Sequence, residues 1–164
     1  MVSKSDFDPS EWKIVASAPI IAAAVISASD DVGDDNDSED EEITAFKNVL
    51  VKLRKKYGST SIINEVIDEI ENDGTDEFEI VYAALGASAS HESPLDDRIK
   101  EVGKAGEIID RVADKKDAKQ YKKFLLDAAT AVASASKEGF FVLGSSISKK
   151  EDFFLRQLQS TLNM

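Results

Sequence analysis

Apolar residues recur every three or four positions along most of the chain, the spacing that places them on one side of an α-helix. Isoleucine, valine, leucine and aromatic residues follow this spacing in seven stretches, and no stretch alternates in the way that a half-buried strand would. The pattern therefore predicts an all-α protein. Because 164 residues is a usual length for one domain, we expect a single compact bundle of about seven helices spanning residues 1–164.

Start and stop signals bound the predicted helices. Serine or aspartate can cap free backbone amides, a glutamate three residues later can reach back to the cap, and glycine ends a helix. Proline suits the first helical position. The seven stretches are Trp12 to Ser29, begun by Asp8-Pro9-Ser10-Glu11; Ser38 to Tyr57, stopped by Gly58; about 62–73, stopped by Gly74; Thr75 or Asp76 to Leu85; Ser93 to Val112; Asp117 to Val132; and Ser148 to Leu162.

The first predicted helix contains a long run without charge, from Ile14 to Ser29. These sixteen residues are fewer than the roughly 20 that span a bilayer, and the run contains Pro19. Acidic residues precede it, whereas a signal peptide begins with basic ones. We therefore expect a buried core helix with a bend at Pro19, and no integral membrane segment.

A short repeat links the first and sixth predicted helices. Val25-Ile26-Ser27-Ala28-Ser29 matches Val132-Ala133-Ser134-Ala135-Ser136 at four of five positions, an offset of 107 residues. Each copy is followed by a loop, a capping box and an amphipathic helix, which gives candidate halves of about 9–57 and 117–163. We expect two central Ala/Ser-rich helices related by a pseudo-two-fold, each paired with the helix after it. A similar composition of two helix ends would give the same match.

This order of elements resembles the tellurite-resistance TerB-like superfamily. The resemblance rests on an alanine-rich helix that ends in small and acidic residues, Ala22 to Asp31, and on the capped helix start at 38–42. It implies an all-helical fold with an internal pseudo-two-fold. It also implies an acidic surface that holds a metal ion. The loop in this chain is longer and more acidic than the usual one, and its glycine is displaced to Gly33.

Charge is distributed very unevenly along the chain. The net charge is −12, and residues 30–42 hold nine acids and no base. No basic patch is evident elsewhere in the sequence, which argues against a nucleic-acid partner and against anionic lipid. The chain has no cysteine and one histidine, so disulfides, thiolate zinc sites and histidine-rich metal sites are excluded.

The acidic loop, at about 30–38, is the candidate metal site. In a frame that starts at Asp31, oxygen-bearing side chains stand at positions 1, 5, 7, 9 and 12 of an EF-hand-like loop. Gly33 and Asn36 depart from the EF-hand pattern at positions 3 and 6. The candidate ligands for Ca²⁺ or Mg²⁺ are Asp30, Asp31, Asp35, Asp37, Glu39 and Glu42. The alternative is a solvated loop whose last acids complement a helix N-terminus.

An enzymatic alternative uses two pairs of acids. Glu39 and Glu42, and then Glu65 and Asp68, have the spacing with which all-α nucleotide pyrophosphohydrolases of the MazG-like kind hold Mg²⁺. Acids three apart share a helix face, so the two pairs can meet at one ion only if their helices bring them together.

The function expected from the sequence is that of a cytoplasmic, TerB-like interaction or stress-response module. It would bind a protein partner or a second copy of itself, and a divalent cation at the acidic loop would tune it. No residue stands out as catalytic. A short basic cluster at Lys52, Arg54, Lys55 and Lys56 could pair with acids of another chain.

Overall fold

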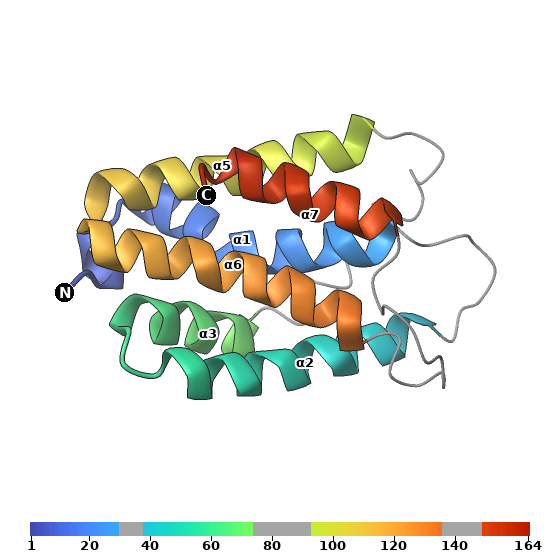
Figure 1. Ribbon diagram of the computed structural model, residues 1–164. Coiled ribbons are helices and arrows are strands. Elements are labelled where there is room, and N and C mark those ends of the chain that lie inside the picture. Colours follow the sequence, from blue (N-terminus) through green and yellow to red (C-terminus); the bar gives the residue numbers. More distant parts are fainter. Residues whose placement is uncertain (30–37, 74–92, 136–148) are drawn as a thin grey trace.

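The computed structural model describes residues 1–29, 38–73, 93–135 and 149–164, and this part of the chain is helical without a strand (Figure 1). The elements are a short 3₁₀ helix η1 (Lys4–Asp6) and the helices α1 (Pro9–Ser29), α2 (Ser38–Tyr57), α3 (Ser61–Asp73), α5 (Ser93–Val112), α6 (Lys115–Ala135) and α7 (Lys149–Thr161). The all-α prediction is confirmed. The helix predicted from Thr75 or Asp76 to Leu85 lies outside the described residues.

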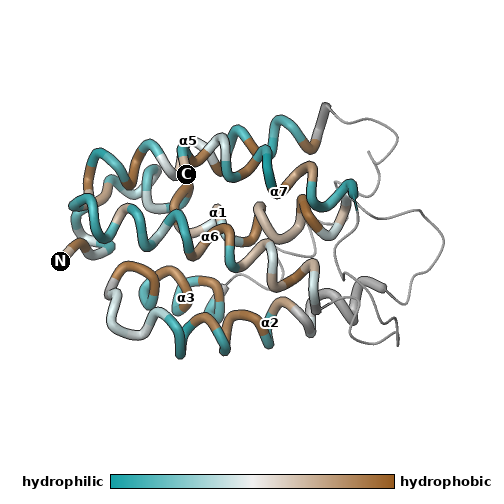
Figure 2. The backbone as a smooth tube through the Cα atoms, viewed as in Figure 1, coloured by the Kyte–Doolittle hydropathy of each residue, from teal (hydrophilic) through white to brown (hydrophobic). Residues whose placement is uncertain are grey.

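Helix α1 is the axis of the bundle. It packs most extensively against α5 and α6, and also against α7 and α3, while α2 packs against α6 and α3. In Figure 1, α5 and α7 lie above α1, and α2 and α3 lie below it. The outer helices alternate between hydrophilic and hydrophobic positions along their length (Figure 2). That alternation is expected for helices that bury one side against a common core.

The second half of α1 is buried on every side. All residues from Ala18 to Ser29 are buried, most of them alanine, isoleucine or valine. A helix that is apolar all round belongs in the interior, and small side chains let neighbouring helices approach closely. Among the described helices, α1 alone is long and apolar enough to cross a membrane, and 78% of its most apolar window is buried inside the bundle. The prediction of a buried core helix is confirmed.

A proline in the middle of α1 leaves one backbone carbonyl without its helical partner. Pro19 has no N–H, so it cannot donate to the carbonyl of Val15, four residues earlier. The hydroxyl of Tyr121, on α6, donates to that oxygen at 2.7 Å. Tyr121 is fully buried, and burial raises the pKa of its hydroxyl, which keeps it protonated as a donor. The two central helices are therefore joined by a buried hydrogen bond at the proline.

Local signals in the sequence account for most helix ends. Glu11 accepts from the backbone N–H of Asp8 at 3.4 Å, as the first start signal predicts. The predicted start of the sixth helix, at Asp117, is wrong by two residues. Asp114 is the cap, because its carboxylate accepts from the backbone N–H groups of Lys116 and Asp117 at 2.8 and 2.9 Å. These hydrogen bonds, that from Asp117 first, lower the pKa of Asp114 and keep it an acceptor.

The expected contact between the two Ala/Ser-rich helices is present, since α1 packs against α6. The expected pairing of α1 with the next helix, α2, is not observed, because α2 packs chiefly against α6 and α3. The sides of α1 are taken by α3, α5, α6 and α7 instead.

The Tyr121 hydrogen bond leads to a prediction about stability. Replacing Tyr121 with Phe leaves the Val15 carbonyl buried without a donor, so we expect the free energy of unfolding to fall by about 1–3 kcal/mol. In a Pro19→Ala background the backbone N–H of residue 19 can donate to the Val15 carbonyl. Tyr121→Phe should then lower the free energy of unfolding by less than it does in the wild-type chain. Urea unfolding of the wild type, both single variants and the double variant measures this coupling. Equal costs in the two backgrounds would contradict it.

Candidate functional site

The candidate metal ligands lie at the edge of what the structure describes. Asp30, Asp31, Asp35 and Asp37 fall outside the described residues, as do the side chains of Glu39 and Glu42, whose backbone forms the start of α2. Within the described residues, no group of three or more acidic or histidine side chains is arranged to hold a metal ion. The cation site at residues 30–42 stays a prediction from the sequence.

The acids of the enzymatic alternative are placed at different levels of the bundle. Asp68 binds Arg54 at 2.7 Å, and the backbone N–H of Lys4 donates to Glu65. Arg54 stands twelve residues after Glu42 on α2, which is about 18 Å along a helix. Glu65 and Asp68 therefore lie near the end of α2 opposite to Glu39 and Glu42. Because the side chains of Glu39 and Glu42 lie outside the described residues, the shared Mg²⁺ site of this alternative stays a prediction from the sequence.

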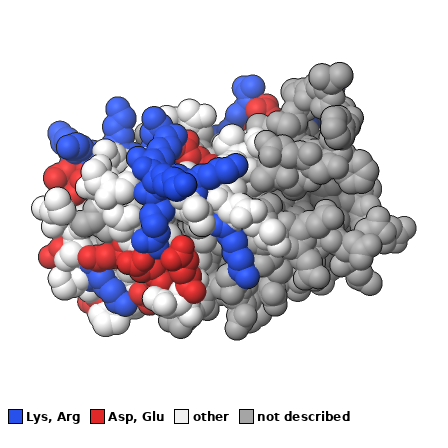
Figure 3. Space-filling model, turned by 90° about the horizontal axis from the view of Figure 1, so that it is seen from below, with Lys and Arg blue, Asp and Glu red and all other residues white. Residues whose placement is uncertain are grey.

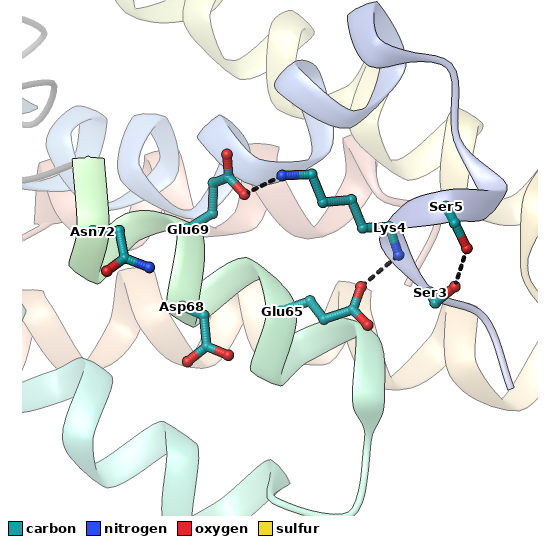
Figure 4. Close-up of a pocket in the computed structure, with 7 residues that line it drawn as sticks. All are labelled: Ser3, Lys4, Ser5, Glu65, Asp68, Glu69 and Asn72. Atoms are coloured by element: carbon teal, nitrogen blue, oxygen red, sulfur yellow. Dashed lines mark hydrogen bonds and ion pairs between the residues drawn. The ribbon is translucent and has the colours of Figure 1, made fainter.

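A shallow hollow of about 480 Å³ lies where the N-terminal segment meets α3, and several of the residues that line it bind one another (Figure 4). The Nζ atom of Lys4 lies 2.7 Å from Glu69, and 5.4 Å from the centre of the Trp12 ring. Figure 4 shows Glu65 and Glu69 directed at Lys4, whereas Asp68 points away from it. These contacts of Lys4 therefore hold the N-terminal segment against α3.

The contact between Lys4 and Glu69 affects the pKa of Glu69. The hydrogen bond from Lys4 lowers the pKa of Glu69, partial burial opposes the effect, and the indole N–H of Trp12 adds to it. Trp12 itself is only 5% exposed and packs at 5.8 Å against Phe7, so it is a core residue.

A basic face is the most distinctive surface that the structure describes. Figure 3 shows Lys and Arg side chains gathered on one part of the molecule, next to a row of acidic side chains. Helices α2 and α6 lie side by side, and their outward positions hold exposed lysines. We define the basic face by these six residues: Lys52, Lys55, Lys56, Lys116, Lys119 and Lys123.

Three hydrogen-bonded contacts fix α2 against α6 beneath this face. Asp127 on α6 receives a hydrogen bond from Lys56 at 2.6 Å and another from the hydroxyl of Tyr57 at 2.5 Å. Thr60, just after α2, donates to Gln120 at 2.5 Å. Burial, and then the Asp127 carboxylate, raise the pKa of Tyr57, so its hydroxyl remains a donor. The contacts hold the lysines of the two helices in one surface.

The lysines of the basic face are mostly without acidic partners. Lys56 pairs with Asp127, but none of the other five has a carboxylate of the described residues within ion-pair distance. Arg54, on the side of α2 that faces α3, differs because it pairs with Asp68 at 2.7 Å and Glu71 at 2.9 Å. These partners, Asp68 first, raise the pKa of Arg54. Thus the cations next to α3 are neutralised, and those of the basic face are not.

Sequence reasoning missed this face because its lysines come from two distant segments. The cluster at Lys52 to Lys56 is visible in the sequence, but only the packing of α2 against α6 shows that residues 115–123, which contain five lysines and one acid, continue it. A further signal was available, since residues 43–64 contain five bases and no acid. The inference that the chain has no basic patch is wrong for the folded surface.

Comparison with known proteins adds no identification. No protein-family model matches the chain, and no curated protein or solved structure is detectably similar to it. The TerB-like resemblance stays a prediction from the sequence.

The Lys4–Glu69 contact predicts a dependence of stability on pH. The pKa of Glu69 is lower in the folded chain than its ordinary value of 4.5, so the carboxylate stabilises the fold above that value. The contribution is lost as the pH falls through the lower, folded pKa. A Glu69→Gln variant should lose about 0.2–1 kcal/mol of unfolding free energy at pH 7, and the loss should vanish towards pH 3. Urea unfolding across this pH range measures the difference.

A matched control is Glu107→Gln, because Glu107 is exposed and has no ion pair within the described residues. Its effect should be small and nearly independent of pH. If the cost of Glu69→Gln were the same at pH 3 as at pH 7, the ion pair would not be its cause.

Proposed function

We propose that this chain is a helical interaction module that binds an acidic segment of a partner protein through the basic face of α2 and α6. The observation that carries the proposal is the set of six exposed lysines, five of which lack an acidic partner among the described residues. In a chain of net charge −12 such a concentration of positive charge is local, and it can orient an acidic partner.

The support for a surface, and not for a catalytic site, comes from the chemistry of these residues. Lysines on two outward helix faces provide exposed point charges. The Asp127 carboxylate is already held by Lys56 and Tyr57. The two helices are rigid supports, so the charges keep fixed positions relative to one another.

An acidic protein segment fits this face better than a nucleic acid does. The face has no exposed aromatic ring among its described residues on which a base could stack, and no arginine to read a base edge. The nearest arginine, Arg54, is engaged by two carboxylates. In addition, the nine acids of residues 30–42 would repel a dense line of phosphates more strongly than a segment with spaced carboxylates.

We include in this proposal the TerB-like fold and the role of an interaction or stress-response module that the resemblance implies. An all-helical chain in which α1 packs against α6 is consistent with the pseudo-two-fold that the resemblance implies. In that reading, a divalent cation at residues 30–42 would lower the negative charge of the chain, and so would ease the approach of an acidic partner.

Binding of a defined acidic peptide tests the proposal. The probe is a fluorescein-labelled peptide of twelve residues that alternates glutamate and serine, with fluorescence anisotropy as the readout at low salt. Replacing Lys52, Lys55, Lys119 and Lys123 with Gln should raise the Kd at least ten-fold. The affinity of the wild type should also fall as salt is added, because the interaction is ionic.

The matched control replaces four other exposed lysines, Lys47, Lys100, Lys149 and Lys150, with Gln. It changes the net charge by the same amount and should leave the Kd within about two-fold. Equal weakening by both variants would mean that net charge, not the basic face, drives binding. Tighter binding of a labelled twelve-nucleotide single strand than of the peptide would replace the protein partner with a nucleic acid.

A further inference from the structure

A second surface feature lies on the other side of the bundle axis, where α1 meets α5. A groove of about 330 Å³ is lined by residues of these two helices alone, within the part of the chain that the structure describes. Helix α1 contributes Lys13, Ile14, Ser17 and Ile21. Because Lys13, Ser17 and Ile21 are four residues apart in turn, they form one stripe along the helix. None of them belongs to the basic face.

The floor of the groove is apolar. Ile21 is 9% exposed, and Ile14 is half-buried against the core. Between them lies Ser17, whose hydroxyl donates to the carbonyl of Lys13 at 2.7 Å. A ligand that carried only charge would leave this floor in contact with water, so the groove favours a ligand with an aliphatic part.

The rim of the groove is positively charged. From α5 come Arg98, Glu101 and Lys104, three residues apart in turn. Arg98 binds Glu101 at 2.9 Å, so these two charges largely cancel. Lys13 and Lys104 remain, and neither has a carboxylate within ion-pair distance among the described residues. The rim therefore has an excess of two positive charges over an apolar floor.

We propose that this groove binds a small amphiphilic anion, a carboxylate with a short aliphatic chain. Lys13 and Lys104 would hold the carboxylate, and the chain would cover Ile14 and Ile21. The volume lies at the lower end of the range for small-molecule sites, roughly 300–1,000 Å³, so it suits one short chain and not a peptide or a two-chain lipid. The site is independent of the basic face, since α2 and α6 contribute nothing to it.

Octanoate is the probe that tests this proposal, with isothermal titration calorimetry as the measurement. Octanoate should bind saturably at one site per chain. Acetate has the charge without the chain, and octylamine has the chain with the opposite charge. Each should bind at least ten-fold more weakly than octanoate if both the rim and the floor contribute.

Variants separate this groove from the basic face. Lys13→Gln with Lys104→Gln should weaken octanoate binding at least five-fold and leave binding of the acidic peptide within two-fold. Lys119→Gln with Lys123→Gln removes the same charge and should leave octanoate binding unchanged. Equal binding of octylamine, or unchanged binding of octanoate to the Lys13 and Lys104 variant, would overturn the proposal. Either result would leave the proposed function of the basic face untouched.

Discussion

The structure depends on a helix that is buried all the way round and yet contains a proline. An interior helix must satisfy its backbone within the protein, because an unpaired buried carbonyl costs about as much as a lost hydrogen bond. Pro19 removes one donor from α1, and the Tyr121 hydroxyl replaces it from α6. This requirement sets where α6 lies along α1. The small residues that follow Pro19 then allow α5 and α6 to approach the axis closely.

The distribution of charge follows from that arrangement. Since α1 has no polar side in its second half, the surrounding helices must provide the polar surface, and most of their charged residues lie outward. When α6 packs against α1, it also meets α2, and the Asp127 contacts with Lys56 and Tyr57 hold the two helices in register. Lysines far apart in the sequence thereby become one face. On α3, in contrast, Asp68 and Glu71 are paired with Arg54, and Glu69 is paired with Lys4.

Much of the fold could be predicted from the sequence because the signals that start, stop and orient a helix lie within the helix or next to it. The starts at Ser38 and Ser93, the ends at Tyr57 and Asp73 and the burial of α1 all follow from caps, glycines and the spacing of apolar residues. The start of α6 was misplaced because Asp114 and Asp117 are both good caps, and only the folded backbone shows which one accepts the free amides.

The contacts that matter most for function could not be predicted in this way. Tyr121 lies 106 residues from Val15, and Asp127 lies 70 residues from Tyr57. Periodicity assigns each of these residues to a face of its own helix, but not to a partner on another helix. For the same reason the basic face and the groove between α1 and α5 emerge only when the packing is known. The acidic residues 30–42 are the reverse case, since they are conspicuous in sequence and lie largely outside the described structure.

Native-state hydrogen exchange of the α1 backbone amides tests most directly whether this helix is the axis on which the bundle depends. Amides of residues 22–26 should exchange only when the whole protein unfolds. Their exchange free energy should therefore equal the free energy of unfolding measured with urea, and should be at least as high as that of any amide in α2, α3 or α7. Faster exchange in α1 than in those outer helices would contradict the account, because it would mean that the bundle survives while its central helix opens.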